Sequence, residues 1–483
     1  MATNRTTTGV IWSAVERFST MGIQFILNII IARILAPSDF GVIGMLAVFL
    51  SICQCLIDGG FSSALIQTNR RTDKDYGTVF LFNIAISIFL YGVLFISSSG
   101  ISRFYNLPIL EPVLKVIGIN IIIGSLANVQ RAILTINVDF RTQSLVSITG
   151  ALLSGGIGIY LAYIGYGVWA LVAQTLINGA VQSGLLWILS KDKFKIFFDE
   201  DSFKRLGGFG VKLMLASLLH TVYENLYSLF IGKRFNSQEL GYYSRADQFG
   251  VFSASTLAIV IGRVAYPVLS QKQDDKSELR KLYTKFIKVS TFIVFPIMIL
   301  LSALSKQVVL TLLTEKWLPI VPLLMVLAIE GMCAPLNKIN LSLLQAVGRS
   351  DLFLRLEIIK KTIAVCILLF SIRYGVFWVC IGRLFYSVLA TLINMYFTVR
   401  IIDKSYYEQV KDWMPNFLSS LIVGIGAFFM ANAISNAFVS LLLTLVCGVC
   451  LYLLLSRIMS NDVYNMVTSI ARDYLKRLKK TRE

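Results

Sequence analysis

Cationic side chains occur inside several long apolar stretches of this sequence, where a charge is unfavourable unless a polar cavity or a partner receives it. Arginine can bind two phosphate oxygens at once, and the lysine ammonium attracts phosphate as a point charge. These cations therefore predict a site for a phosphate or diphosphate group. The alternative is that they extend to lipid headgroups at the membrane surface. The cations concerned are Arg17, Arg131, Arg263, Lys338, Lys212 and Arg383.

Uncharged polar residues accompany these cations at helical spacing. Between residues 120 and 135 a polar or small side chain recurs every three or four positions, so these residues share one face of a helix. Similar stripes begin at Arg17 and run through residues 212–227. We expect the stripes to form walls of a water-accessible cavity. The first stripe consists of Asn120, Gly124, Asn128, Arg131 and Thr135. The residues predicted as uncharged lining are Gln24, Asn28, Asn128, Tyr227 and Asn337.

Titratable groups inside the apolar stretches are candidates for coupling to an ion gradient. His220, the chain's one histidine, lies one helical turn before Glu224, and such a pair would respond to protons near neutral pH. A structural hydrogen bond between helices is the equally favoured alternative. Glu330 and Asp58 are the other candidates. A proton or sodium gradient is therefore the candidate driving force, and we expect no bound cofactor, no metal and no catalytic residue.

The elements that position these residues are membrane-spanning helices. The chain has 483 residues, of which 56% are hydrophobic and 15% charged, against roughly 25% charged residues in a soluble domain. Apolar runs near twenty residues recur throughout, each long enough to cross a hydrocarbon core of ~30 Å as a helix. The expected fold is all-α, with about fourteen spans. They lie near 9–35, 40–60, 77–98, 113–135, 145–164, 166–189, 208–231, 246–268, 286–305, 318–345, 356–373, 375–398, 415–434 and 437–457.

The distribution of lysine and arginine predicts the orientation of these spans. Cations concentrate in every second connection and in the basic tail, and membrane proteins keep such connections in the cytoplasm. Both termini are therefore expected on the cytoplasmic side. The net charge of +18 is explained by this topology and does not indicate a nucleic-acid-binding surface, because the cations form no patch on one domain.

Matching positions predict an internal repeat, and the alternative is chance similarity among glycine-rich helix ends. A shift of about two hundred residues places Arg33 on Arg234 and the Asp39 turn on the Glu239 turn. Six spans per copy would give two lobes of the same orientation, related by an axis along the membrane normal. The predicted divisions are an N-terminal lobe at 1–190, a cytoplasmic loop at 191–207, a C-terminal lobe at 208–400, two additional helices at 401–457 and a basic cytoplasmic tail at 458–483.

Several segments are similar to those of one known family. They include LAPSDFGVIGM at 35–45, DGGFSSALIQ at 58–67, GYGVWALVAQ at 165–174 and LGYYSRADQF at 240–249. In these segments the chain resembles the Wzx-type polysaccharide flippases of the multidrug, oligosaccharidyl-lipid and polysaccharide exporter superfamily, closest to the colanic-acid exporter type.

The resemblance implies a V-shaped fold of two six-helix lobes plus two helices in a bacterial cytoplasmic (inner) membrane. It implies alternating access acting on an undecaprenyl-diphosphate-linked oligosaccharide, for O-antigen, capsule or exopolysaccharide synthesis. Its partners would be this lipid-linked substrate, membrane lipids, a polysaccharide polymerase and glycosyltransferases. The family's role for cavity arginines, binding the diphosphate, is carried over to Arg17, Arg131 and Arg263.

Three other functions are alternatives to this one. A multidrug antiporter of the same superfamily would share the lobes and topology, but its cavity would centre on acidic and aromatic residues. A membrane glycan polymerase or ligase would need catalytic groups and usually a substantial external loop, and every connection predicted to be external is short. A structural scaffold would have no need of buried charges in both lobes.

Overall fold

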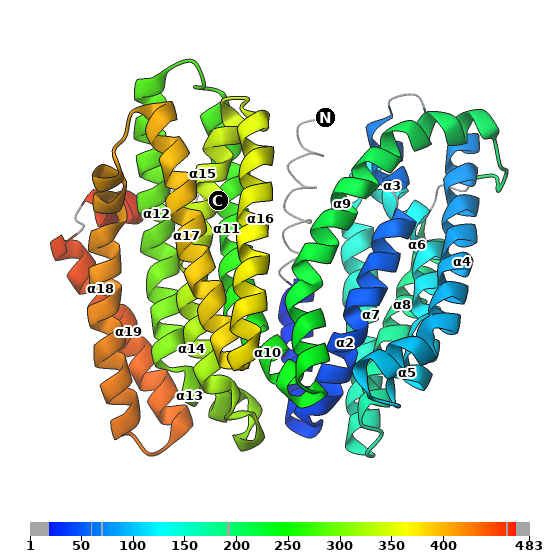
Figure 1. Cartoon of the computed structure of the whole chain (residues 1–483), viewed down its shortest axis with the longest axis horizontal. Coiled ribbons are helices and arrows are strands. Elements are labelled where there is room, and N and C mark those ends of the chain that lie inside the picture. Colours follow the sequence, from blue (N-terminus) through cyan, green and yellow to red (C-terminus); the bar gives the residue numbers. More distant parts are fainter. Residues whose placement is uncertain (1–18, 59, 69–70, 191–193, 460–461, 470–483) are drawn as a thin grey trace, which may run out of the picture. The chain divides into compact units, whose positions relative to one another are not determined.

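The structure is a computed structural model that describes residues 19–58, 60–68, 71–190, 194–459 and 462–469. Every regular element in these ranges is helical, as Figure 1 shows, so the all-α prediction is confirmed. Helices suit an apolar chain in lipid, because each satisfies its backbone N–H and C=O groups internally.

The chain divides into two compact units, residues 1–241 and 242–483, which we call the first and second unit. In the first unit a helix at Ser19–Ile34 precedes the labelled elements. They are α2 (Pro37–Asp58), α3 (Phe61–Gln67), α4 (Asp73–Tyr105), α5 (Leu110–Ile117), α6 (Ile119–Ile136), α7 (Phe140–Tyr163), α8 (Val168–Leu189) and α9 (Glu200–Arg234). Helix α10 (Ser237–Phe249) begins in the first unit and ends in the second.

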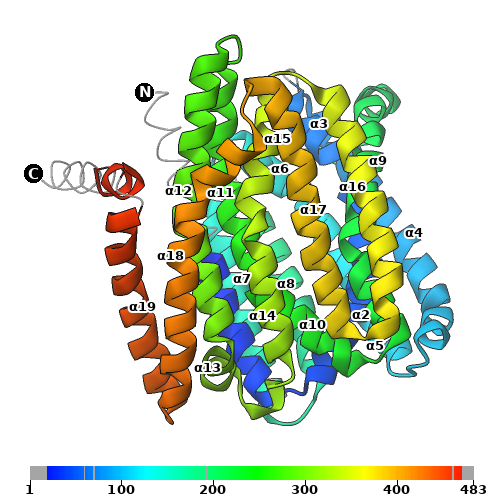
Figure 2. The same cartoon turned by 60° about the vertical axis from the view of Figure 1, so that its left-hand side comes forward.

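The second unit continues with long helices joined by turns and by short helical segments. They are α11 (Val251–Ser270), α12 (Lys276–Ala303), α13 (Ser305–Val308), η1 (Val309–Leu313), η2 (Glu315–Trp317), α14 (Ile320–Gly331), α15 (Cys333–Ala346), α16 (Ser350–Ser371), η3 (Ile372–Tyr374), α17 (Val376–Ile402), α18 (Tyr406–Ala433) and α19 (Ala437–Met459). Figure 2 shows α12, α18 and α19 side by side.

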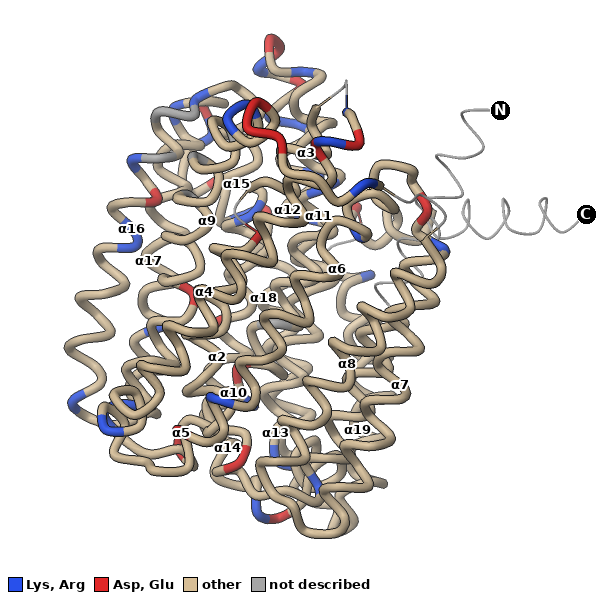
Figure 3. The backbone as a smooth tube through the Cα atoms, turned by 90° about the vertical axis from the view of Figure 1, so that its right-hand side faces the viewer, with Lys and Arg blue, Asp and Glu red and all other residues tan. Residues whose placement is uncertain are grey.

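Eleven helical segments of the described chain are long and apolar enough to cross a membrane, or twelve if the bent α9 is one span. Two further predicted spans correspond to helices that fall short of this test. One is Ser19–Ile34, which begins where the description begins, and the other is α16, whose first half carries several charges. The count of fourteen stays a prediction. Figure 3 shows that charged residues gather mostly towards helix ends and connections.

The two units do not coincide with the lobes expected from the repeat. Helix α9 packs against α2, α3 and α4 and so belongs to the first unit, whereas the repeat assigned 208–231 to the second lobe. Packing shows which helices are in contact, whereas the repeat is a similarity between two parts of the sequence. The repeat and its boundaries therefore stay a prediction.

Close backbone approaches fix α9 in the first unit. Gly60, between α2 and α3, has φ of 71°, a left-handed conformation that favours glycine, and a Cβ there would lie 2.2 Å from the Gly210 carbonyl oxygen. Gly210 lies where α9 bends by 49° between the segments Glu200–Gly208 and Leu213–Arg234. The turn after α2 therefore rests on the bend of α9.

The connection before α9 crosses the start of α4. A Cβ on Gly77 would lie 2.4 Å from the carbonyl oxygen of Lys195, so the connection needs a glycine beneath it. The Asp199 backbone N–H donates to Thr78 Oγ1 at 2.9 Å, and Arg205 pairs with the buried Asp75. These contacts hold the first turns of α9 against α4.

Candidate functional site

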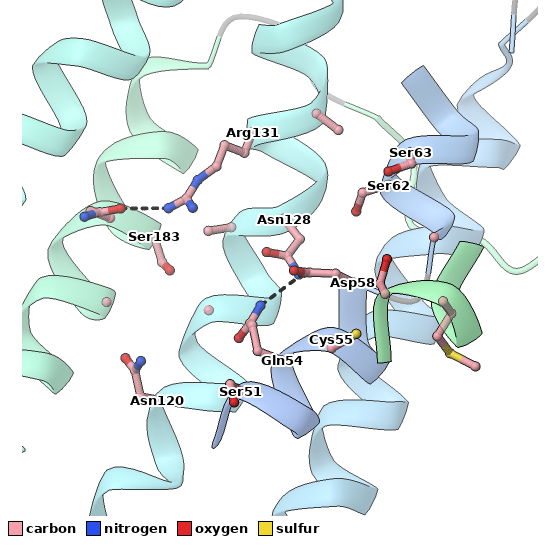
Figure 4. A pocket seen from close by; sticks show the side chains of 18 of the residues that line it. Ser51, Gln54, Cys55, Asp58, Ser62, Ser63, Asn120, Asn128, Arg131 and Ser183 are labelled. Carbon is pink, nitrogen blue, oxygen red and sulfur yellow. Dashed lines mark hydrogen bonds between the residues drawn. The ribbon is translucent and has the colours of Figure 1, made fainter. Parts of the chain in front are cut away.

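The first unit contains a polar cavity of about 810 Å³, formed by α2, α3, α6, α8 and α9. This volume lies within the roughly 300–1,000 Å³ of small-molecule sites. Most of its polar lining is uncharged, as Figure 4 shows for part of it. The polar lining residues are Ser51, Gln54, Asp58, Ser62, Ser63, Asn120, Asn128, Arg131, Thr135, Thr175, Asn178, Gln182, Ser183, Ser217 and Thr221.

Helix α6 supplies one wall of this cavity. All five residues of the stripe predicted between 120 and 135 line it. The opposite face of α6 packs into the apolar core, where Val129 and Ile133 are buried with Phe80 and Leu65. This division of α6 into a polar and an apolar face is what fixes its rotation, so the sequence pattern alone predicted which residues face the cavity.

Arg131 is oriented by a chain of amides. Its Nη2 donates to Gln182 Oε1 at 2.7 Å, and Gln182 Nε2 in turn donates to Asn178 Oδ1 at 3.0 Å. Gln182 and Asn178 lie one turn apart on α8, and Figure 4 shows the Arg131 guanidinium reaching towards that helix. The exposed guanidinium is thus held across the cavity, on the lining side of α6.

Asp58, the last residue of α2, places a carboxylate in the same cavity. Its Oδ1 accepts hydrogen bonds from Gln54 Nε2 at 3.1 Å and from Asn128 Nδ2 at 2.9 Å. Asp58 and Arg131 are the charged members of the described lining. One carboxylate and one guanidinium give no net charge, so hydroxyl and amide groups determine the character of this cavity.

The other residues predicted on the first span and on the span near 208–231 do not line this cavity in the described structure. Arg17 and the Lys212 side chain fall outside the described residues. Asn28 is half-buried and Gln24 exposed on the helix Ser19–Ile34. Tyr227 lies further along α9 than Thr221, the last α9 residue of the lining.

The predicted proton-responsive pair is close but not hydrogen-bonded. His220 Nδ1 and Glu224 Oε1 are 3.9 Å apart, beyond hydrogen-bond distance, and both side chains are more than half exposed. Helical spacing therefore brought the two residues together, as expected, but their environment is not the buried one that would tune a proton site.

In the second unit, two predicted cations lie near each other on neighbouring helices. The Lys338 side chain on α15 packs against Gly262 of α11, where a Cβ would lie 2.5 Å from Lys338 Cε. Arg263, the next residue on α11, is exposed. Asn337 on α15 accepts a hydrogen bond from Asn394 Nδ2 at 2.8 Å, which ties α15 to α17.

Arg383 on α17 is held in an ion cluster of the second unit. Its Nη1 lies 2.7 Å from Asp247 Oδ1, its Nε lies 3.2 Å from Glu330 Oε2, and it also donates to the Tyr243 hydroxyl. The side chains of Arg383 and Glu330 are only 13% and 10% exposed. The guanidinium is thus already neutralised by protein carboxylates, unlike the anion-binding cation that the sequence predicts.

Comparison with known proteins identifies the family. Residues 30–322 match the family model described as "Polysaccharide biosynthesis protein", which is more than half of the 483 residues. The chain belongs to this polysaccharide biosynthesis protein family. The resemblance stated above is thereby confirmed.

Curated relatives extend over nearly the whole chain. The teichuronic acid biosynthesis protein TuaB of Bacillus subtilis is 26% identical over 435 residues, covering 88% of this chain and 89% of that protein. The lipopolysaccharide biosynthesis protein WzxC of Escherichia coli is 24% identical over 424 residues, covering 86% and 85%. The succinoglycan biosynthesis transport protein ExoT of Rhizobium meliloti is 21% identical over 477 residues, covering 96% and 95%.

Solved structures share the fold. The lipid II flippase MurJ, in an inward closed conformation, aligns with a TM-score of 0.75 and 16% identity, covering 94% of this chain and 99% of that chain. An inward-facing multidrug resistance MATE family transporter aligns with a TM-score of 0.60 and 15% identity, covering 81% and 99%. The family member described here therefore has the fold of these membrane transporters.

Sequence reasoning missed part of the site. Gln54 on α2 and Asn178 and Gln182 on α8 were not singled out, although Asn178 and Gln182 stand one turn apart inside an apolar span. The rule that found the α6 stripe would have found them too. Asp247, the partner of Arg383, gave no such signal, because it lies in the polar stretch of α10.

Proposed function

We propose that this protein flips undecaprenyl-diphosphate-linked oligosaccharides from the cytoplasmic to the outer leaflet of a bacterial cytoplasmic membrane. The observation that carries the proposal is the cavity of the first unit, which combines many amide and hydroxyl groups with one exposed guanidinium. Such groups donate and accept hydrogen bonds as sugar hydroxyls require, and arginine is suited to phosphate. The names of two relatives, a lipopolysaccharide biosynthesis protein and a succinoglycan biosynthesis transport protein, support this substrate class.

In this proposal the sugars occupy the cavity and Arg131 contacts the diphosphate. Asp58, held by Gln54 and Asn128, accepts hydrogen bonds from sugar hydroxyls. The Asp58 carboxylate also repels the diphosphate, since both are anions. This repulsion directs the diphosphate towards Arg131. In the second unit, Arg263 and Lys338 have no carboxylate partner among the described residues, and they stay candidate phosphate-binding cations of that unit.

Transport would follow the alternating access that the family resemblance implies, with both termini in the cytoplasm. Polymerase and glycosyltransferases would act after and before the flipping step. The protein would transport its substrate without chemical conversion, in keeping with the relatives named as transport and biosynthesis proteins.

For ion coupling we propose Glu330 ahead of the other candidates. Glu330 and Asp247 share the single guanidinium of Arg383, so the cluster holds one more negative than positive charge when both are ionised. A proton or a sodium ion would balance this excess. His220 and Glu224 are exposed and not hydrogen-bonded to each other, which makes them weaker candidates.

The direct test is reconstitution of the full-length protein into vesicles with undecaprenyl-diphosphate-linked oligosaccharide, measuring how fast the sugars reach the opposite leaflet. Arg131→Ala should lower the initial rate about ten- to a hundredfold, the usual effect of losing a charge-assisted hydrogen bond. Arg131→Lys should lower it less, because the charge remains. The matched control is Lys204→Gln, which removes an exposed cation paired with Glu200 outside the cavity.

A parental rate in Arg131→Ala would refute the assignment of the cavity. If vesicles with the parental protein moved no lipid-linked sugar but extruded a cationic drug, the multidrug antiporter function would replace the proposal.

A further inference from the structure

A second hollow, which we call the basic groove, lies in the second unit between the start of α12 and residues 462–469, which follow α19. Its volume is about 530 Å³. Helix α12 contributes most of the lining, and the residues after α19 contribute the facing wall. The lining residues are Ser277, Arg280, Lys281, Thr284, Lys285, Lys288, Asp462, Val463 and Met466.

Two of the four cations in the basic groove are neutralised by protein carboxylates. Arg280 Nη2 lies 2.5 Å from Glu408 Oε1, and Lys281 Nζ lies 2.8 Å from Glu278 Oε1. The ammonium groups of Lys285 and Lys288 have no carboxylate partner among the described residues.

Lys285 and Lys288 are spaced to act together. They are three residues apart on α12, so their side chains are neighbours on one face and repel each other. An anion between them would remove this repulsion. Asp462 is the acidic residue of the described lining and comes from the facing wall, so it leaves the α12 side positive.

The basic groove lies at the boundary between charged and apolar parts of α12. Lys288 is the last charged residue of that helix, and the stretch from 289 to 303 contains none. On the facing wall Val463 is buried against Phe292 and Tyr452 in an apolar cluster. A ligand there would meet ammonium groups at one end and hydrocarbon at the other, the two halves of a phospholipid.

From this arrangement we propose that the basic groove binds the phosphate of an anionic glycerophospholipid, with its acyl chains along the apolar part of α12. Basic pockets between helices at the cytoplasmic surface are suited to such headgroups, and α12 begins on the side that the cation distribution assigns to the cytoplasm. The site is separate from the cavity of the first unit, and the proposal does not depend on the transported substrate. Bound lipid would hold residues 462–469 against α12.

The experiment compares lipids on the full-length protein by native mass spectrometry, with phosphatidylglycerol, phosphatidylcholine and inorganic phosphate titrated separately. The parental protein should retain phosphatidylglycerol preferentially. The double variant Lys285→Gln/Lys288→Gln should lose affinity for it by about 25-fold, since each lysine near an anionic surface contributes about a fivefold factor. The matched control Lys272→Gln/Lys276→Gln removes two cations beside the groove but outside its lining.

Three outcomes would overturn the proposal. They are parental binding by the double variant, an equal loss in the control, and equal retention of phosphatidylcholine. Competition by inorganic phosphate at the same concentration as lipid would instead identify a free-phosphate site.

If the double variant does not fold, the proposal is tested on the parental protein by measuring which lysines are acylated with and without lipid. Phosphatidylglycerol should protect Lys285 and Lys288 but not Lys272, and uniform modification would refute the site.

Discussion

Removal of Arg383 should destabilise the second unit more than removal of either of its carboxylate partners. In Arg383→Met, Glu330 is left 8% exposed and Asp247 loses its contact at 2.7 Å, so two carboxylates remain close together without a cation. Breaking a buried ion pair from one side is destabilising by about 3–5 kcal/mol. Since the side chains of Arg383 and Glu330 are both largely buried, this range applies to their pair.

Compensating variants separate a charge effect from loss of packing. Arg383→Met/Glu330→Gln removes one charge of each sign, and it should recover most of the stability lost in Arg383→Met. Asp247→Asn should be the mildest single change, because the Asp247 side chain is 37% exposed and solvent screens its charge. The expected order of stability is parent, Asp247→Asn, the double variant and then Arg383→Met.

The assay is thermal unfolding of the full-length protein in one detergent, followed by the fraction that remains monodisperse after heating. A second measurement, titration with a denaturing detergent, checks that the order does not depend on the method. An Arg383→Met midpoint equal to that of the parent would refute the reasoning. So would a double variant less stable than Arg383→Met, because removal of the unpaired carboxylate should relieve repulsion.

Three further changes have defined outcomes. Gly77→Ala should destabilise the first unit by about 1–3 kcal/mol, because the new Cβ meets the backbone of the connection before α9. The control is Gly92→Ala on the same helix, whose Cβ meets nothing within 4 Å. In the same thermal assay this control should be neutral or stabilising. Gln182→Leu should slow flipping by freeing Arg131 from its 2.7 Å hydrogen bond without lowering stability, and a parental rate would contradict this. Asp199 caps α9, and hydrogen bonds from the Ser202 side chain and backbone, with Lys74, hold the pKa of its carboxyl below the usual value. Its stabilisation should be present at neutral pH and lost as the pH falls below about 4 through this lowered pKa, so the difference in unfolding midpoint between parent and Asp199→Asn should disappear there.

The all-α fold and one wall of the cavity could be predicted because both depend on local periodicity. The α6 stripe alternates with the buried Val129 and Ile133, and that alternation determines which face of the helix points to the cavity. The remaining walls depend on which helices meet. Gln54 reaches the cavity only because α2 ends beside α6, and the bend of α9 at Gly210 carries no periodic signal.

The second unit shows that a charged residue inside an apolar stretch does not by itself predict a ligand-binding site. Arg383 and Arg131 looked equivalent in sequence, since each is a lone arginine inside a long apolar run. Arg383 meets Glu330 from α14 and Asp247 from α10, partners 53 and 136 residues away, whereas Arg131 meets the neutral amide of Gln182. Whether a protein carboxylate neutralises an arginine is thus decided by the long-range partners that the fold brings to it.

This difference bears directly on how the substrate would be held. Among the described cations predicted for the anion site, Arg131 lines a cavity and Arg383 is neutralised, while Arg263 is exposed and Lys338 extends along Gly262. A diphosphate would therefore be met by few cations, and the sugars by many neutral groups. Loss of Arg131 should reduce flipping for every sugar sequence, whereas Asn128→Leu or Asn178→Leu should change the preference among sugars. Equal loss with all sugars in the asparagine variants would show that the neutral lining does not select them.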